Sequence, residues 1–221
     1  MQDNRAFQRM LLSAKERICV HAPEEIAQKS GAVFHKDKSF FELQSLNQRI
    51  QITFPECIFQ PRIDEWQQLV ILHYLDLADG TAVSPQMISF GALKDGLIRG
   101  TKFDHDMERE LGGFLAGMTQ EQLWRACEGL GAQLVEDRAD LCAVFPFLPR
   151  YPVWLKVWFA DDEFEASGKL LVSRSADHYL TIEDAVTVGE LLLSRLKCLS
   201  FRGLIHKTPN PVDCLYTAFK K

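Results

Sequence analysis

Apolar residues recur at helical spacing through the first part of the chain. Within residues 4–20 they fall every three or four positions, with Arg, Lys and Gln between them, which is typical of an amphipathic helix. A second, short helix begins at Pro23 and ends at Gly31, because glycine readily takes the left-handed conformation that caps a helix. A third helix is expected between Asp64, a good N-cap, and Gly80.

Alternation of apolar and polar residues predicts strands in two separate blocks. Residues 39–46 and 49–54 are expected to pair around a tight turn at Asn47-Gln48. From residue 131 onward the alternation returns and predicts four strands, over residues 133–136, 141–147, 153–159 and 169–173.

The segment between these blocks divides into a loop and two helices. Glycines at 80, 91, 96 and 100 predict a loop over residues 80–101, and helices are expected over 104–118 and 119–130. The second of these opens with the capping box Thr119-x-x-Gln122, and Thr181-x-x-Asp184 predicts a similar start for a last helix that reaches residue 196.

Helices and antiparallel strands thus come in separate blocks, without βαβ alternation. This order predicts an α+β fold, with an antiparallel sheet packed with helices in a single domain. We expect the domain to span residues 24–199, with an N-terminal helix at 1–23 and a C-terminal extension at 200–221.

Composition and charge exclude several classes of protein. The chain has 221 residues, 47% hydrophobic and 25% charged, enough to bury a core. A net charge of −5 argues against nucleic acid as the main partner, since phosphate binding needs concentrated Lys and Arg. Apolar runs such as Leu69–Leu72 are far shorter than the roughly 20 residues that span a bilayer. The first 20 residues lack the apolar core of a signal peptide, so we expect a cytoplasmic protein without a membrane partner.

The six cysteines are far apart in the chain. The closest pair, Cys127 and Cys142, has 14 residues between them, so no C-x-x-C motif indicates a local iron–sulfur or zinc site. In a reducing compartment we expect free, mostly buried thiols. A ligand set assembled from distant cysteines is the alternative.

His178, followed by Tyr179, is the best single candidate for chemistry. A histidine ligates iron, cobalt or zinc through a neutral ring nitrogen, and it transfers protons near pH 7. Asp177, Glu183 and Asp184 are candidates to orient its second nitrogen. The alternative is a structural His-Tyr pair that docks the last helix.

A second His-Tyr pair, His73-Tyr74, lies inside the apolar third helix. Trp66, Leu69, Val70 and His73 share one face, so this histidine is expected to face the core. It is either a satisfied buried histidine or a second metal or tetrapyrrole ligand that faces His178 across a cleft.

Two polar segments complete the list of candidates. Asp161, Asp162 and Glu163 form an acidic corner with hard oxygen ligands for Mg²⁺ or Ca²⁺, or a carboxylate for general acid catalysis. The alternative is a solvated hairpin turn in which Phe164 anchors the turn in the core. Arg150, held in a proline-rich turn, is either a clamp for a carboxylate or phosphate or a surface arginine.

These residues carry a resemblance to a known family. The marks are Leu148-Pro149-Arg150-x-Pro152, the strand ending in Trp158, Asp161-Asp162-Glu163-Phe164, Ser175-Ala-Asp-His178-Tyr179 and Thr181-x-Glu183-Asp184. Over residues 24–196 the chain resembles the uncharacterised family called domain of unknown function 3786, found mainly in anaerobic bacteria and archaea. It departs from the family pattern at Ala160 and Glu165, where glycine and proline are usual.

The resemblance implies a setting and no reaction. Some relatives are joined to a cysteine-rich iron–sulfur domain of the type found in corrinoid proteins, which implies anaerobic one-carbon or corrinoid chemistry. We therefore expect a binding or accessory protein of anaerobic metabolism, with a corrinoid or haem-type tetrapyrrole as cofactor. Its cofactor-binding residues would be His73, Arg150, His178 and Tyr179.

Two other functions stay open. One is a metal-assisted enzyme that uses Asp161, Asp162 and Glu163 as metal ligands together with His178. The sequence has no G-x-x-x-x-G-K-[ST], G-x-S-x-G or H-E-x-x-H motif to support it. The other is a module that docks an iron–sulfur or methyltransferase partner protein.

Overall fold

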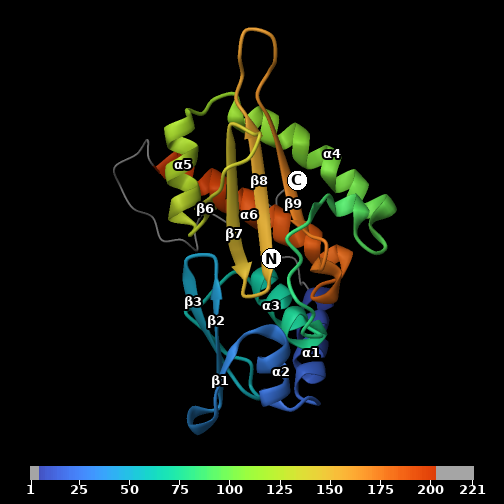
Figure 1. The fold of residues 1–221 in the computed structure, drawn as a ribbon. Helices are drawn as coiled ribbons and strands as arrows, with labels where there is room; N and C mark the ends of the chain where they lie inside the picture. The colour runs from blue at the N-terminus through green and yellow to red at the C-terminus, as the bar shows by residue number, and fades with distance from the viewer. Residues whose placement is uncertain (1–4, 203–221) are drawn as a thin grey trace.

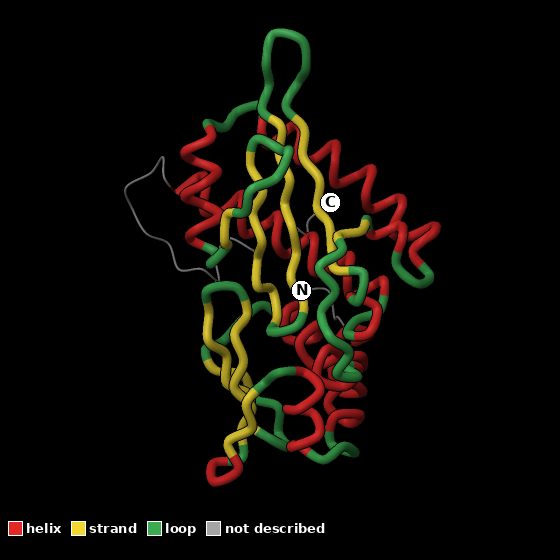
Figure 2. The backbone as a smooth tube through the Cα atoms, in the orientation of Figure 1, coloured by secondary structure: helices red, strands yellow, loops and turns green. Residues whose placement is uncertain are grey.

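The described part of the chain contains six α-helices and two antiparallel sheets (Figures 1 and 2). The computed structural model describes residues 5–202. The α+β class is confirmed, with two sheets where the sequence predicted one. No helix among the described residues is long and apolar enough to cross a membrane. The predicted C-terminal extension lies outside the described residues from position 203 onward.

The N-terminal half contains a four-stranded sheet and three helices. The sheet has the order β1 (Val33–His35), β2 (Phe40–Ser45), β3 (Gln48–Thr53), β4 (Phe59–Gln60). The helices are α1 (Arg5–Ile18), α2 (Pro23–Ser30) and α3 (Glu65–Leu77). α3 packs against both α1 and α2, beside the small sheet in Figure 1. The expected hairpin is therefore confirmed as the centre of a larger sheet.

The second sheet has five strands in the order β5-β9-β8-β7-β6. Their bounds are β5 (Met87–Ile88), β6 (Gln133–Leu134), β7 (Leu141–Leu148), β8 (Tyr151–Trp158) and β9 (Ser167–Ser173). The loop between β8 and β9 projects well beyond the sheet at the top of Figure 1. The two sheets meet where Leu46 N donates to Pro146 O, at 2.8 Å.

The remaining α-helices are α4 (Gly96–Leu115), α5 (Gln120–Gly129) and α6 (Ile182–Arg202). The short 3₁₀ helices are η1 (Lys36–Lys38), η2 (Phe90–Ala92) and η3 (Ala176–His178). α6 lies behind the five-stranded sheet in Figure 1 and packs against α3, α4 and α5. Many of its apolar residues are fully buried, among them Val188, Leu192 and Leu196. This helix is therefore the centre of the core, as its sequence of closely spaced apolar residues indicates.

Three local predictions about helix ends are confirmed. The carboxylate of Asp64 accepts hydrogen bonds from two backbone N–H groups in the first turn of α3. Gly31 ends α2 with φ = 77°, a left-handed conformation that side chains disfavour. Thr119 and Gln122 form the expected reciprocal capping box of α5.

The predicted loop over residues 80–101 is wrong at its end, because α4 already begins at Gly96. A Cβ atom on Gly96 would lie 2.3 Å from Phe90 O, and one on Gly100 would lie 2.2 Å from it. These glycines let the helix pack directly on the backbone of η2. Asp104, expected at the helix start, instead accepts hydrogen bonds from Phe90 N and Gly91 N, at 3.0 and 2.8 Å.

The cysteines of the described residues are free thiols, as expected. Cys57, Cys127 and Cys142 are buried, Cys198 is half-buried and Cys19 is exposed. Cys214 lies outside the described residues. Burial raises the pKa of the Cys57 thiol to about 11 and that of Cys127 to about 12.

Candidate functional site: two exchanged histidine–aspartate pairs

The pattern His-Tyr-Leu-x-x-x-Asp occurs twice in the chain. The first copy is residues 73–79, at the end of α3 and the start of the following loop. The second is residues 178–184, which run from η3 into the first turn of α6. Both His-Tyr pairs and Asp184 were candidates from the sequence, whereas Asp79, six positions after His73, was not.

The fold exchanges the partners of the two copies. Nδ1 of His73 lies 2.7 Å from Oδ1 of Asp184, and Nδ1 of His178 lies 2.7 Å from Oδ2 of Asp79. Each histidine thus bonds to the aspartate of the other copy. We call these contacts, His73–Asp184 and His178–Asp79, the exchanged pairs; they tie the end of α3 to η3 and the start of α6.

The two tyrosines stack between these elements. The rings of Tyr74 and Tyr179 are 5.7 Å apart with 24° between their planes, and both side chains are fully buried. The hydroxyl of Tyr179 donates to Thr81 O. The hydroxyl of Tyr74 donates to Ser30 O and accepts from Arg150 N at 3.0 Å. Tyr179 is therefore buried and docks the last helix. This is the role that the sequence analysis gave it as the alternative to cofactor binding.

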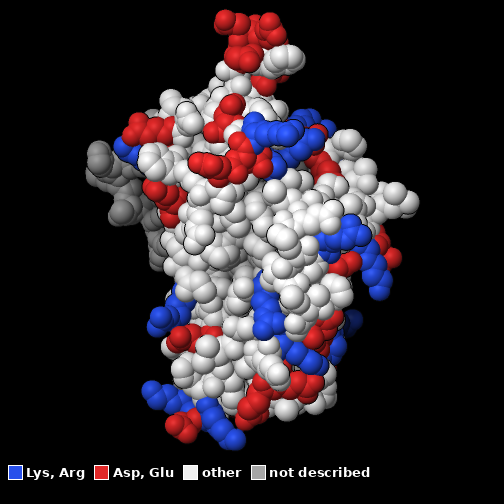
Figure 3. Space-filling view, in the orientation of Figure 1, with Lys and Arg blue, Asp and Glu red and all other residues white. Residues whose placement is uncertain are grey.

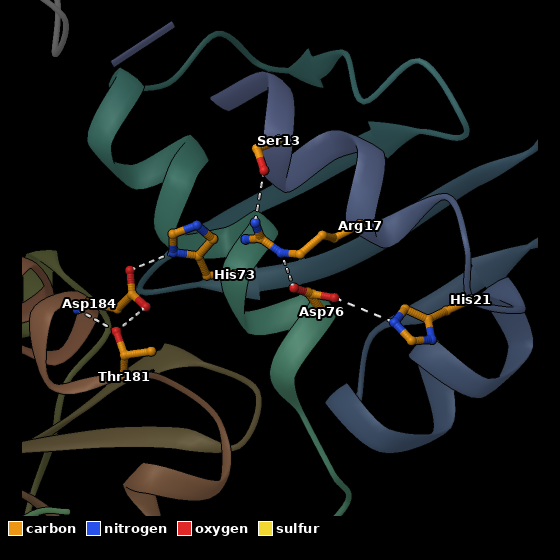
Figure 4. A network of polar contacts seen from close by, with 7 residues as sticks. All are labelled: Ser13, Arg17, His21, His73, Asp76, Thr181 and Asp184. Carbon is orange, nitrogen blue, oxygen red and sulfur yellow. Dashed lines mark hydrogen bonds and ion pairs between the residues drawn. The ribbon is translucent and has the colours of Figure 1, made fainter. Parts of the chain in front are cut away.

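The His73–Asp184 pair is the more buried of the two. The Asp184 side chain is 9% exposed and that of His73 20% exposed. Asp184 Oδ2 also accepts from Thr181 Oγ1 at 2.7 Å, and Thr181 Oγ1 accepts from Asp184 N at 3.3 Å (Figure 4). Because a carboxylate only accepts, Nδ1 of His73 carries the proton and Nε2 is the nitrogen left for other contacts.

The His178–Asp79 pair lies closer to the surface. The side chains of His178 and Asp79 are 46% and 48% exposed. Thr81 adds two contacts, since its Oγ1 lies 3.1 Å from His178 Nδ1 and its N–H donates to Asp79 Oδ1 at 2.8 Å. The hydrogen bond from His178, followed by that from Thr81 N–H, lowers the pKa of Asp79 to about 2. The carboxylate is therefore ionised at neutral pH and fixes the proton of His178 on Nδ1.

Two expectations about these histidines are corrected by this geometry. Asp177, Glu183 and Asp184 were candidates to orient His178, whereas Asp79 does so and Asp184 orients His73. His73 was expected to face the core, but its ring is only partly buried. Both differences arise because α3 and α6 pack against each other, which places residues far apart in the chain side by side.

A second polar network lies one turn further along α3 and faces α1 (Figure 4). Asp76 accepts from Arg17 Nε at 2.7 Å, and its other oxygen lies 3.4 Å from His21 Nε2. Arg17 also donates to Ser13 Oγ at 3.1 Å. This network holds α1 against α3, next to the His73–Asp184 pair, because residues three apart are neighbours on a helix surface.

Arg150 acts on the same loop as Asp79. Its Nη1 donates to Gly80 O at 3.0 Å and its Nη2 donates to Gln28 O at 3.1 Å. Arg150 was a candidate to bind a carboxylate or phosphate. In the structure both of its terminal nitrogens donate to backbone carbonyls instead. The arginine fixes the chain directly after Asp79 against the end of α2.

The acidic corner lies at the tip of the β8–β9 hairpin, where Figure 3 shows a group of acidic side chains. Asp161 Oδ1 accepts from Glu163 N and Phe164 N, both at 2.8 Å, and these hydrogen bonds lower its pKa. Asp162 is exposed beside them. Phe164 is 70% exposed, so the expectation that it anchors the turn in the core is wrong.

The structure does not bring the acidic corner and His178 together. The corner precedes β9 and His178 follows it. A strand of seven residues rises about 23 Å, so these groups lie at opposite ends of the sheet. Among residues 5–202, no group of three or more His, Cys, Asp or Glu side chains is placed to hold a metal ion.

Fold and site together define an α+β protein in which two histidine–aspartate pairs join the core helices α3 and α6. A family model described as "Domain of unknown function (DUF3786)" matches residues 22–195. The chain belongs to this family, in agreement with the resemblance of residues 24–196. No match was found among curated proteins or among solved structures.

Proposed function

We propose that this protein is a binding or accessory domain that takes up a corrinoid or another tetrapyrrole through Nε2 of His178. The observation that carries the proposal is the His178–Asp79 hydrogen bond on a half-exposed histidine. Because Asp79 holds the proton of the neutral ring on Nδ1, Nε2 is the nitrogen that carries the lone pair, and it has no hydrogen-bond partner among the described residues.

The donor set of this pair suits a metal-containing cofactor. Histidines that ligate metals almost always donate their other ring N–H to a carboxylate, a carbonyl or water, which fixes the ring and raises its basicity. Asp79 supplies such a carboxylate to His178. A neutral imidazole suits cobalt, iron and zinc. The cofactor would supply the metal and its redox or ligand-exchange chemistry.

His178 is favoured over His73 because of its exposure. Both rings have Nδ1 held by an aspartate, but the side chain of His178 is 46% exposed and that of His73 20%. We therefore assign His178 as the ligand and His73 to the joint between α3 and α6. The proposal does not include the alternative in which His73 and His178 bind one cofactor from opposite sides of a cleft.

Tyr179 and Arg150 enter the proposal as positioning residues. The Tyr179 hydroxyl bonds to Thr81 O and Arg150 bonds to Gly80 O, so together they hold the loop that carries Asp79. Fixing this loop fixes the carboxylate, and the carboxylate orients His178. The role in anaerobic metabolism that the resemblance implies belongs to the same proposal, as does the cytoplasmic location expected from the sequence.

The test is absorption spectroscopy of the full chain, purified without oxygen and titrated with aquocobalamin and, separately, with haem. Binding of Nε2 to the metal shifts the absorption bands, and native mass spectrometry gives the stoichiometry. We expect a one-to-one adduct, lost in His178→Ala and weakened about tenfold in Asp79→Asn, the range found for residues that orient metal ligands.

The matched control is His105→Ala, an exposed histidine on α4. This variant is expected to bind as the natural chain does. Absence of any band shift with both cofactors, or an equal shift in His178→Ala, would overturn the proposal.

A further inference from the structure

A groove runs between the start of α5 and the outer edge of the five-stranded sheet. It has a volume of about 1010 Å³, a size that accommodates several side chains of a ligand. The residues that decide its chemistry are Trp124, Leu134, Val135, Glu136, Asp137 and Asp140.

The groove has an exposed apolar floor. Trp124 on α5 is 44% exposed, and Leu134 and Val135 at β6 are 45% and 42% exposed. Large apolar side chains gathered in one depression and rimmed by polar residues mark interaction sites more often than scattered ones do. Tryptophan is in addition one of the residues that dominate binding energy at protein interfaces.

The backbone at this edge is open. β6 pairs with β7 on one side, and within residues 5–202 no strand pairs with its other side. Val135 N donates to Cys142 O at 3.0 Å. Because neighbouring residues of an antiparallel pair alternate in direction, the N–H and C=O of Leu134 point away from β7. The groove therefore offers main-chain groups to an added strand as well as apolar contacts.

Carboxylates surround the floor, over α5 and the loop that follows β6 (Figure 3). Lys156 Nζ lies 2.8 Å from Asp137, and Arg125 pairs with Glu121 at the far rim. Asp140 accepts only a backbone N–H, that of Phe159. Among the described residues Glu136 and Asp140 thus have no cationic partner, and the rim attracts positive charge.

We propose that this groove binds an extended segment of a partner protein in which Lys or Arg alternates with apolar residues. The segment adds to β6 as a further antiparallel or parallel strand. The apolar residues of the segment contact Trp124 and Leu134, and its long basic side chains reach the carboxylates of Glu136 and Asp140 at the rim. Main-chain hydrogen bonds to Leu134 set the position of the segment.

The test uses three fluorescent octapeptides and the full chain, with binding measured by fluorescence anisotropy. The first alternates Lys and Val, the second alternates Glu and Val, and the third is the Lys-Val peptide with N-methylated valines, which lack the backbone donor. We expect the Lys-Val peptide to bind and both others to bind at least tenfold more weakly. Equal binding of the three would overturn strand addition with charge recognition.

Variants of the chain locate the site. Trp124→Ala and Glu136→Lys are each expected to raise the Kd for the Lys-Val peptide at least tenfold. Phe164→Ala, which removes an even more exposed aromatic at the β8–β9 tip, is the control and is expected to leave the Kd unchanged. Glu136 is exposed, so its substitution tests the groove even where Trp124→Ala unfolds.

One further peptide tests whether the occupant of the groove is a partner protein or the C-terminal segment of this chain. Residues 203–221 carry three lysines and several apolar residues, and a synthetic peptide of this sequence is added in competition. Tight displacement of the Lys-Val peptide that depends on Trp124 would identify the chain's own C-terminal segment as the occupant and overturn the proposed partner. Failure of the Lys-Val peptide to bind at all would overturn it as well.

Discussion

Tyr74 and Tyr179 stack in the core, 5.7 Å apart with 24° between their rings, and each follows a histidine whose aspartate partner belongs to the other element. The contact joins the end of α3 to the segment that leads into α6. Since α3 and α6 both contribute many buried apolar residues, the geometry of the candidate site depends directly on the stability of the core.

The hydroxyls of the two tyrosines are expected to contribute unequally. Tyr74→Phe leaves both Ser30 O and Arg150 N without a partner, whereas Tyr179→Phe leaves only Thr81 O. A buried group left unsatisfied costs about 1–3 kcal/mol. We expect urea unfolding to show a larger loss of unfolding free energy for Tyr74→Phe than for Tyr179→Phe; the reverse order would contradict this hydrogen-bond network.

Tyr151 provides the matched control for those variants. Its side chain is buried, and its hydroxyl has no hydrogen-bond partner among the described residues. Removing a buried hydroxyl that makes no bond relieves its desolvation cost. Tyr151→Phe is therefore expected to be neutral or stabilising by up to about 1 kcal/mol.

The pH dependence of stability is expected to reveal the His178–Asp79 pair. The pKa of Asp79 is lowered in the folded protein, from 3.8 to about 2, mainly by the hydrogen bond from His178. The unfolded chain therefore takes up the proton first as the pH falls. The stabilisation by Asp79 is complete well above pH 4 and is lost as the pH decreases towards 2.

Asp79→Asn removes this contribution. Because the pair is half-exposed and screened by solvent, we expect a loss of only about 0.2–1 kcal/mol at pH 6. The difference from the natural chain should vanish near pH 2. Denaturant unfolding at several pH values measures both effects, with the exposed Asp162→Asn as control. A difference that persists unchanged at pH 2 would be inconsistent with titration of Asp79.

Two glycines of α4 are expected to respond in opposite ways to alanine. A Cβ on Gly100 would lie 2.2 Å from Phe90 O and 2.5 Å from Phe90 C, so Gly100→Ala forces α4 away from η2. Such overpacking typically costs about 1–3 kcal/mol. A Cβ on Gly113 has no neighbour within 4 Å, and alanine there should stabilise the helix by about 0.5–1 kcal/mol. Thermal unfolding of the two variants tests this contrast.

The thiols are expected to differ strongly in reactivity. Burial raises the pKa of Cys127 to about 12, which lowers its thiolate fraction at pH 8 on the order of 10³-fold relative to an ordinary cysteine. Cys57, with a pKa of about 11, should also react slowly. Alkylation by iodoacetamide, followed by peptide mass spectrometry, should label the exposed Cys19 first among the five cysteines of residues 5–202. Early labelling of Cys127 would show that α5 opens readily.

Features that depend on near neighbours in the chain could be predicted from the sequence. The N-cap Asp64, the left-handed Gly31 and the capping box of Thr119 and Gln122 are all as expected. Each involves groups within a few residues of each other, so the local pattern contains the whole interaction. The pairing of β2 with β3 through a short turn follows for the same reason.

Features that depend on distant backbone could not be predicted in this way. Gly96 and Gly100 were interpreted as loop residues, since glycine usually interrupts helices. In the structure they are helical and make room for the backbone of Phe90. Phe164 was expected in the core because of its apolar ring, but the hairpin that carries it extends beyond the helices.

The sequence by itself determined the α+β class, the family, most helix and strand positions and the two histidines of the candidate site. The tertiary structure alone decided that His73 bonds to Asp184 and His178 to Asp79. Both aspartates lie six residues after a histidine of their own segment, so spacing does not distinguish the two pairings. Packing of α3 against α6 makes the choice, because it brings each histidine within hydrogen-bond distance of the other segment's carboxylate.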